Sequence, residues 1–312
     1  MTTPGLGRIT PIQGYLLQLA GYRLRRTREQ ASLSDTERLN VMREGLAALR
    51  RATKVDLGYD LGAWEAYLLQ HQESFRHGYA KGTTQRHVAA ARADPQRRRL
   101  VAAPADEDGP SGLSLASRAV SSSAGEDRVA RYGDDTRDVL VVADGAGGSG
   151  AGAEAADAVL HAIRRAPWAL DVCDVLREAD HIVAQASHGG ETTVVVARVI
   201  DGEVVGASVG DSGAWLFTPA EAVELTGRQV RKPLLGSGRA RPVPFRAMLV
   251  GRLLLATDGL LKYIPLAKLT ELSVRQPVAS SCDALIQAAR LPSGGLQDDI
   301  AVLLAETGAK RQ

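Results

Sequence analysis

The sequence predicts an α+β fold in which sheets and helices pack in layers, preceded by a region made of helices. Residues 1–103 carry apolar side chains at helical spacing, whereas short apolar runs joined by turn residues begin near residue 113. Hairpins and helices then occur in blocks and not in strict alternation, which favours an α+β layered domain over a doubly wound parallel sheet. We expect a helical domain at 1–103, a linker at 104–112, an α+β domain at 113–307 and a tail at 308–312.

The helical domain has its clearest start signal in the capping box Ser34-Asp35-Thr36-Glu37, where a hydroxyl and a carboxylate each accept a backbone N–H. The apolar residues that follow recur at helical spacing, so one face of this helix should be buried; they are Leu39, Met42, Leu46 and Leu49. A second helix is expected at 61–75, with Leu61, Trp64, Leu68 and Phe75 inward. A third is expected at about 83–100, ending in Arg97-Arg98-Arg99.

The charge of the chain is divided unevenly. Residues 1–100 hold 17 Lys and Arg against 9 Asp and Glu, a charge of +8, which leaves −6 to the rest. This asymmetry indicates two units with separate tasks. The basic excess fits a solvated helical face, and two other roles stay open for this region: contact with nucleic acid, and docking of a partner protein.

The α+β domain contains short strands and a few helices. Strands are expected at LSLASRAV (113–120), VLVVAD (139–144), TTVVVARVI (192–200), EVVGASVG (203–210), AWLFT (214–218), RLLLATDG (252–259) and IAVLLAET (300–307). Asp201-Gly202 between two of them indicates a tight hairpin. Helices are expected at 153–166, 170–187 and 280–290.

Composition excludes several classes of protein. The chain is 45% hydrophobic and 24% charged, which is ordinary for a globular protein. Its two cysteines, Cys173 and Cys282, exclude a disulfide scaffold and a C-x-x-C site. The first residues lack the pattern of a secretory signal, and no apolar run approaches the ~18 residues of a membrane helix. We expect a cytoplasmic location and no membrane partner.

Two motifs match known sites but lack the required context. Gly145, Gly147 and Gly150 form G-x-G-x-x-G, yet residues 164–168 supply neither the second strand nor the acid of a dinucleotide site. Residues 206–210 form G-x-S-x-G, but a turn and a strand follow Ser208 and no histidine comes after it. The second motif therefore lacks the helix and the base of a serine hydrolase.

Acids recur at the ends of the predicted strands. They are Glu126-Asp127, Asp144-Gly145, Asp211, Asp258-Gly259 and Asp298-Asp299. A lone aspartate at a strand end is usually a turn former, but five such positions in one domain indicate that packed strand ends bring carboxylates together. Such a cluster repels itself unless cations neutralise it, and hard oxygen ligands suit Mg²⁺ or Mn²⁺. The glycines after Asp144 and Asp258 would let the backbone approach a metal.

These motifs together resemble a known family. VVADGAGG (141–148) resembles the V-x-D-G-x-G-G signature of the metal-dependent PP2C (PPM) protein serine/threonine phosphatases. ETTVVVA, VGDSGAW, LLLATDGL and LQDDIAVLL follow in the family's order, and GEDR at 125–128 fits its upstream acidic element. The resemblance runs from about 111 to 306 and implies an α-β-β-α sandwich of two antiparallel sheets flanked by helices, in a bacterial type of enzyme with added N-terminal helices.

The resemblance also implies a role for each acid. Asp144 would bridge two Mn²⁺ or Mg²⁺ ions, Gly145 would contribute its carbonyl, and Glu126 or Asp127 would complete one shell. Asp258 and Asp298 would hold the other ion, and Asp211 would serve a third, looser ion together with Asp258. The catalytic residues would be Asp144, Asp258 and Asp298, acting through a metal-activated bridging water on phosphoserine and phosphothreonine in protein substrates of a cognate kinase.

The sequence departs from the family where substrate phosphate is held. Ser122 stands where the family usually has a phosphate-gripping arginine, and Gly213 stands at the arginine of G-D-S-R. Arg118 and Arg128 are the candidate substitutes. Residues 225–245, between Asp211 and Asp258, hold five basic residues and correspond to the family's flap beside the active site. The departures leave a second function open: a catalytically weak module that binds phosphoproteins or regulates them.

Overall fold

The computed structural model describes residues 9–24, 33–74, 83–102, 111–122, 125–134, 136–147, 150–218, 220–275 and 277–308. The chain forms two compact units. The first contains residues 1–103 and 166–170, and the second contains 104–165 and 171–312. Most of the linker expected at 104–112 and of the tail expected at 308–312 lies outside the described residues, as does Phe75.

The first unit consists of helices, as expected. They are α1 (Pro11–Leu19), α2 (Asp35–Thr53), α3 (Leu61–Gln70), a short 3₁₀ helix (Gln72–Ser74), α4 (Thr83–Ala93) and α5 (Pro95–Leu100). The capping box at the start of α2 is confirmed, since the Ser34 hydroxyl accepts the Glu37 N–H at 3.3 Å and the Glu37 carboxylate accepts the Ser34 N–H at 3.0 Å. The apolar faces predicted for α2 and for the described part of α3 are buried.

The single helix expected at 83–100 is wrong. Asp94 ends α4 and caps α5 by accepting the Gln96 N–H at 2.9 Å, and Pro95 takes the first position of α5, where its missing N–H costs nothing. Arg97 is not part of a solvated face either, because it is 3% exposed. Its guanidinium donates to the carbonyls of Leu19, at 3.3 Å, and Tyr59, at 2.9 Å. Arg97 therefore links α5 to the end of α1 and to the segment before α3.

The second unit confirms the expected sandwich of two antiparallel five-stranded sheets flanked by helices. One sheet has the order β1-β10-β9-β6-β7 and the other β2-β3-β4-β5-β8. The strands are β1 (Leu113–Val120), β2 (Arg128–Gly133), β3 (Arg137–Ala146), β4 (Glu191–Ile200), β5 (Glu203–Val209), β6 (Gly213–Phe217), β7 (Ala222–Glu224), β8 (Val243–Met248), β9 (Arg252–Ala256) and β10 (Ile300–Thr307). The helices are α6 (Ala151–Arg164), α7 (Val172–Ala186), α8 (Asp258–Leu261), α9 (Leu266–Ser273) and α10 (Val278–Ala289).

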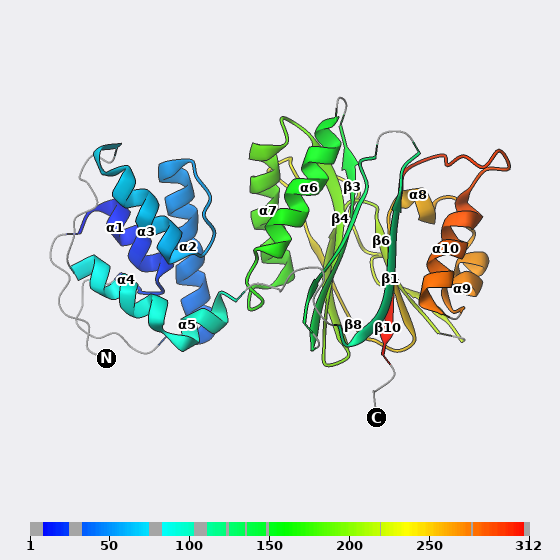
Figure 1. The fold of residues 1–312 in the computed structure, drawn as a ribbon, viewed down its shortest axis with the longest axis horizontal. Coiled ribbons are helices and arrows are strands. Elements are labelled where there is room, and N and C mark those ends of the chain that lie inside the picture. The colour runs from blue at the N-terminus through cyan, green and yellow to red at the C-terminus, as the bar shows by residue number, and fades with distance from the viewer. Residues whose placement is uncertain are drawn as a thin grey trace. The chain divides into compact units, whose positions relative to one another are not determined.

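Two apolar layers hold this unit together. Between the sheets, side chains such as Leu140, Val195 and Leu255 are fully buried. On the outer face of the β1–β10 sheet, α9 and α10 cover a second layer that includes Leu254 and Cys282. The helices α6 and α7 lie against the sheet that contains β3 and β4, and α9 and α10 lie on the opposite side of the sandwich (Figure 1). The strands that carry the predicted acids at their ends are thus held in place by packing.

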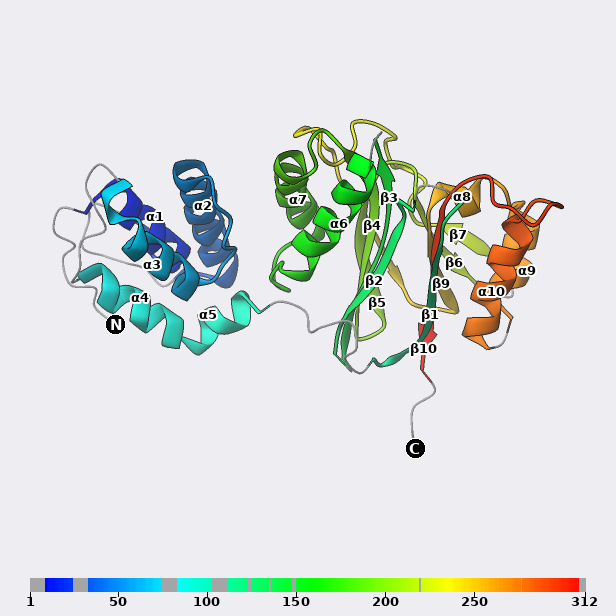
Figure 2. The ribbon, with the colours of Figure 1, turned by 45° about the horizontal axis from the view of Figure 1, so that its top comes forward.

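Three strands and two short helices of this unit were not expected. β2 carries two arginines in six residues, and Arg131 stays in the sheet because it pairs with Asp138 at 2.6 Å. β8 contains Pro244, which lacks an N–H, and an edge strand tolerates proline because one of its sides has no partner strand. Figure 2 shows β7 at the edge of its sheet, on the side of α8 and α9.

The hairpin at Asp201-Gly202 is confirmed, with φ values of 51° and 77° and Ile200 opposite Glu203.

No helix within the described ranges has both the length and the apolar character needed to span a lipid bilayer.

Candidate metal centre

The register of the strands explains why the acids meet. In one sheet Asp144 lies opposite Thr193, near the end of β3 and the start of β4, and Arg128 at the start of β2 lies opposite Ala143. In the other sheet the end of β9, at Ala256, lies opposite the start of β6 and near the start of β10. The turn from β5 to β6, which carries Asp211, passes from one sheet to the other. These strand ends therefore share one end of the sandwich.

Three of the predicted ligands meet there. Asp144, Asp211 and Asp258 each offer a carboxylate oxygen, and these oxygens all lie within 4.8 Å of one another. Asp144 belongs to β3, Asp211 to the turn after β5, and Asp258 is the first residue of α8. The three acids are separated by up to 114 positions along the chain, and the fold brings them close together. Carboxylates at this spacing, in a partly buried position, form an oxygen donor set suited to a divalent cation.

Asp127 extends the group. Its side chain is 7% exposed, shares a hydrogen bond with Asp144, and accepts the Thr257 hydroxyl at 2.6 Å. Burial, together with the charges of Asp299 and Asp298, raises the pKa of Asp127 to about 6. Burial and the neighbouring Asp127, Asp258 and Asp298 raise the pKa of Asp144 to about 8. The metal-free cluster therefore retains protons near neutral pH, which is the expected response of carboxylates that repel one another.

This protonation makes metal binding depend on pH. At pH 7 Asp144 keeps its proton because its pKa is about 8, and a cation must displace that proton to bind. We expect the affinity for Mn²⁺ to rise between pH 6 and pH 8, by at most about tenfold per pH unit for each proton released. Calorimetry at pH 7 in buffers of different ionisation enthalpy should show release of about one proton. An affinity that stays constant over this range would contradict the raised pKa.

Asp298, which is predicted to hold one ion with Asp258, and its neighbour Asp299 have different surroundings in the structure. Asp298 is exposed and near enough to raise the pKa of Asp144, although it is outside the group of three that lies within 4.8 Å. Asp299 is buried and accepts the Ser122 N–H at 2.6 Å, the Ser122 hydroxyl at 2.9 Å and the Glu126 N–H at 2.8 Å. Asp299 thus fixes the segment before β2 that carries the predicted ligands Glu126 and Asp127.

Close packing of the backbone explains why glycine follows Asp144 and Asp258. A Cβ on Gly145 would lie 2.3 Å from the Gly152 carbonyl oxygen, and a Cβ on Gly259 would lie 1.9 Å from the Asp299 carbonyl oxygen. At both positions, glycine allows two backbone segments to pack against each other. From the sequence, the glycines were expected to let the backbone approach a metal ion. The Glu126 carboxylate reaches the start of α6, since a Cβ on Gly152 would lie 2.8 Å from its Oε2.

The structure places Arg118 and Arg128 in other interactions. Arg118 on β1 pairs with Asp283 on α10 at 2.9 Å. Arg128 pairs with Asp157 on α6 at 2.6 Å and donates to the Gly125 carbonyl at 2.6 Å, so it supports the segment that carries Glu126.

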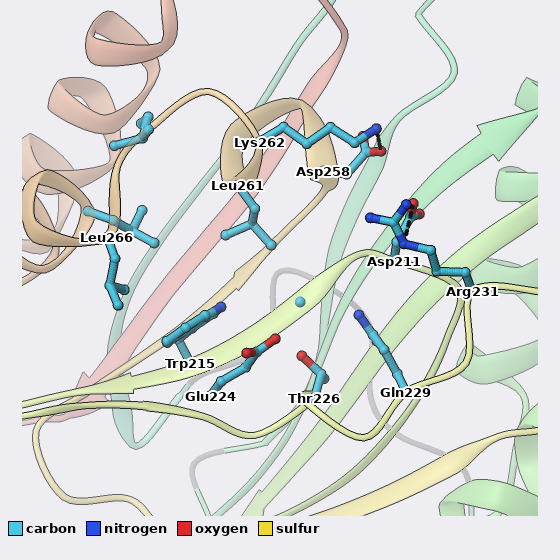
Figure 3. Close-up of a pocket in the computed structure, with 14 residues that line it drawn as sticks. Asp211, Trp215, Glu224, Thr226, Gln229, Arg231, Asp258, Leu261, Lys262 and Leu266 are labelled. Carbon is cyan, nitrogen blue, oxygen red and sulfur yellow. Dashed lines mark ion pairs between the residues drawn. The ribbon is translucent and has the colours of Figure 1, made fainter.

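Two basic side chains reach the acid group: Arg231 belongs to the basic segment expected beside the site at 225–245, whereas Lys262 was not predicted. Lys262 forms an ion pair with Asp258, and Arg231 lies 3.9 Å from Asp211 (Figure 3). The spacing of Asp258 and Lys262, four residues apart on a short helix, is the signal that could have indicated the first pair. Hydroxyl groups also support the site: Thr192 donates to the Asp144 carbonyl at 2.9 Å, and Thr193 bonds Ser212 at 2.6 Å.

The structure gives no support to a protein nucleophile at the motifs set aside above. Ser208 is fully buried near the end of β5, opposite Val195. Cys173 and Cys282 are buried, and burial raises the pKa of each thiol to about 11, so both are protonated at neutral pH.

Comparison with known proteins identifies the fold. No family model matches the chain, and no curated protein matches it. Among solved structures, the serine/threonine phosphatase PstP/Ppp of Mycobacterium tuberculosis is 21% identical with a TM-score of 0.53, and the alignment covers 63% of this chain and 99% of that one. Stp1 of Staphylococcus aureus is 22% identical with a TM-score of 0.55, covering 64% and 97%. The catalytic domain of PstP in complex with two manganese ions is 23% identical with a TM-score of 0.53, covering 62% and 97%. The second unit of this chain therefore has the PP2C fold of bacterial serine/threonine phosphatases.

Proposed function

We propose that residues 113–307 form a metal-dependent phosphatase of the PP2C type that hydrolyses phosphoserine and phosphothreonine in proteins. The observation that carries the proposal is the approach of the Asp144, Asp211 and Asp258 carboxylates to within 4.8 Å at one end of the sandwich. The likeness to phosphatases, one of them in complex with two manganese ions, supports it. A cognate serine/threonine kinase would supply the substrates.

The residues present fit divalent cations. The donors are carboxylate oxygens, which Mn²⁺ and Mg²⁺ prefer, and their mutual repulsion is the kind that a cation relieves. Asp144, Asp258 and Asp298 would hold two ions with Glu126 or Asp127 and the Gly145 carbonyl, and Asp211 would serve a third. When bound, such ions lower the pKa of a water molecule and neutralise charge on phosphoryl oxygens.

The chain's own side chains would then orient the substrate. With the acids neutralised, the Lys262 ammonium and the Arg231 guanidinium are available for a phosphate, and both already point toward the acid group (Figure 3). We propose them as the phosphate contacts in place of Arg118 and Arg128. The loss of an arginine at Ser122 and Gly213 weakens bidentate orientation of a phosphate. The same loss favours the second candidate, a catalytically weak phosphoprotein-binding module.

Hydrolysis of a chromogenic aryl phosphate by the full chain tests the proposal. We expect turnover that depends on added Mn²⁺, and a loss of at least about 100-fold in Asp258→Asn, since changes even to outer residues of metal sites cost 10–100-fold. Asp283→Asn removes an exposed acid on α10 and should keep full activity. Absence of turnover in the wild type, or equal turnover in Asp258→Asn, would reject the enzyme. Binding of a phosphopeptide without turnover would favour the regulatory module.

A further inference from the structure

A cavity of about 390 Å³ lies beside the acid group. Asp211 and Asp258 form its wall on the side of the acids, and the rest comes from β6, β7, the segment after β7, α8 and the start of α9. Figure 3 shows Trp215, Glu224, Thr226 and Gln229 on one side of this cavity and Leu261 on the other. The cavity thus adjoins the place where a substrate phosphate would be hydrolysed.

Gly213 at the start of β6 lines the cavity next to Leu261. A Cβ on Gly213 would lie 2.6 Å from Leu261 Cδ1 and 3.5 Å from Trp215 Nε1, so a larger residue there would displace the Leu261 side chain. Gly213 has no positive φ among the described backbone, so turn geometry does not require a glycine here. The glycine therefore lets Leu261 pack directly on β6, where Leu261 forms one wall of the cavity.

The lining combines an apolar wall with one acid that lacks a cationic partner. Trp215, Leu261 and Leu266 supply the apolar surface. Glu224 lies directly opposite Trp215 in the β6–β7 pair, so the two side chains share one face of the sheet. No described residue forms an ion pair with Glu224. The two basic residues of the lining, Arg231 and Lys262, pair with Asp211 and Asp258 in the metal-free structure and would contact the substrate phosphate in the proposed function.

We propose that this cavity binds a lysine or arginine side chain of the phosphoprotein substrate, close in sequence to the phosphorylated residue; this rests on the proposed function. The methylene stem of such a side chain would pack on Leu261 and Leu266 while its charged end stays near water. The Trp215 ring offers a cation–π contact, and the Glu224 carboxylate offers a charge-assisted hydrogen bond. Glu224 is exposed, so a neutral side chain would leave its carboxylate to water alone, and an acidic one would repel it.

Peptide binding to the full chain with Mn²⁺ tests the proposal. The probes are fluorescent peptides with a non-hydrolysable phosphonate in place of phosphoserine, and with lysine or norleucine placed in turn at each of about three positions on either side. Norleucine keeps the apolar stem and removes the charge. Fluorescence anisotropy should show about fivefold tighter binding of lysine than of norleucine at one position or more, the effect of one partly exposed charge pair.

Substitutions of Glu224 test whether its carboxylate causes the preference for lysine over norleucine. Glu224→Gln should abolish it and Glu224→Lys should reverse it, while Glu221→Gln, an exposed acid before β7 that is not part of the lining, should keep it. All three variants should hydrolyse an aryl phosphate as the wild type does. Equal binding of both peptides at every position, or a preference that persists in Glu224→Gln, would overturn the proposal. If the wild type lacks aryl phosphatase activity, the proposed function fails, and the anisotropy series still decides whether the cavity selects a basic side chain.

Discussion

Asp144→Asn is expected to make the metal-free protein more stable and to remove its stabilisation by Mn²⁺. Burial and the acids around Asp144 raise its pKa to about 8, so the folded state binds this proton more tightly than the unfolded state does. Stability of the metal-free wild type therefore falls as the pH rises from about 4 to about 8. Asparagine carries no charge at any of these pH values and escapes this loss.

Thermal unfolding with and without Mn²⁺ at pH 7.5 measures both effects. A metal at about 100 times its Kd adds about 2.7 kcal/mol, and about 1 kcal/mol shifts the Tm of a domain of this size by about 2–4 °C. The wild type should gain several degrees with Mn²⁺, and Asp144→Asn should gain none while starting from a higher Tm. Asp283→Asn serves as the control and should behave as the wild type does. A variant that is less stable without metal, or that retains the Mn²⁺ shift, would contradict this account.

Gly259→Ala is expected to damage both the fold and the metal site. The new Cβ would lie 1.9 Å from the Asp299 carbonyl oxygen and 3.2 Å from the Asp298 Cβ, and the contact with backbone cannot be relieved by a rotamer change. Overpacking of this kind costs about 1–3 kcal/mol, and the backbone clash places this substitution at the upper end or beyond. Because Asp299 also holds Ser122 and Glu126, the shift should reach the segment before β2.

Gly295→Ala is the matched control for this substitution. Gly295 lies between α10 and β10, in the segment that carries Asp299; no positive φ is required there, and its Cβ would meet only Ser293 Oγ at 3.8 Å. Chemical denaturation should show a change within about 0.5 kcal/mol for Gly295→Ala. For Gly259→Ala, chemical denaturation should show a loss of stability of about 3 kcal/mol or more. Its affinity for Mn²⁺ should be lower by about 10–100-fold. Equal stability of the two variants would mean that the close approach at Gly259 is not required.

Local signals in the sequence predicted the elements that depend on neighbouring residues. The capping box at Ser34 predicted the start of α2, and Asp201-Gly202 predicted the β4–β5 hairpin, because both are decided by residues a few positions apart. The recurrence of acids after apolar strands predicted a common site, and the structure brings Asp144, Asp211 and Asp258 together. In each of these cases a short pattern contains the physical cause.

Features that depend on distant partners could not be predicted in this way. Arg97 looked like part of a charged surface run, but the carbonyls of Leu19 and Tyr59 account for its burial. The role of Asp299 depends on backbone groups more than 170 positions away, at Ser122 and Glu126. The cavity beside Gly213 required the position of Leu261 on α8, a helix of four residues that is too short to show periodicity.

In the proposed function, acids at the strand ends of both sheets form one site for divalent cations. Anomalous diffraction at the manganese edge, from crystals of the full chain grown with Mn²⁺, tests it most directly. We expect manganese peaks in contact with the carboxylates of Asp144, on β3 of one sheet, and Asp258, which begins α8 directly after β9 of the other sheet. Ordered Asp144 and Asp258 side chains with no manganese peak between them would contradict it.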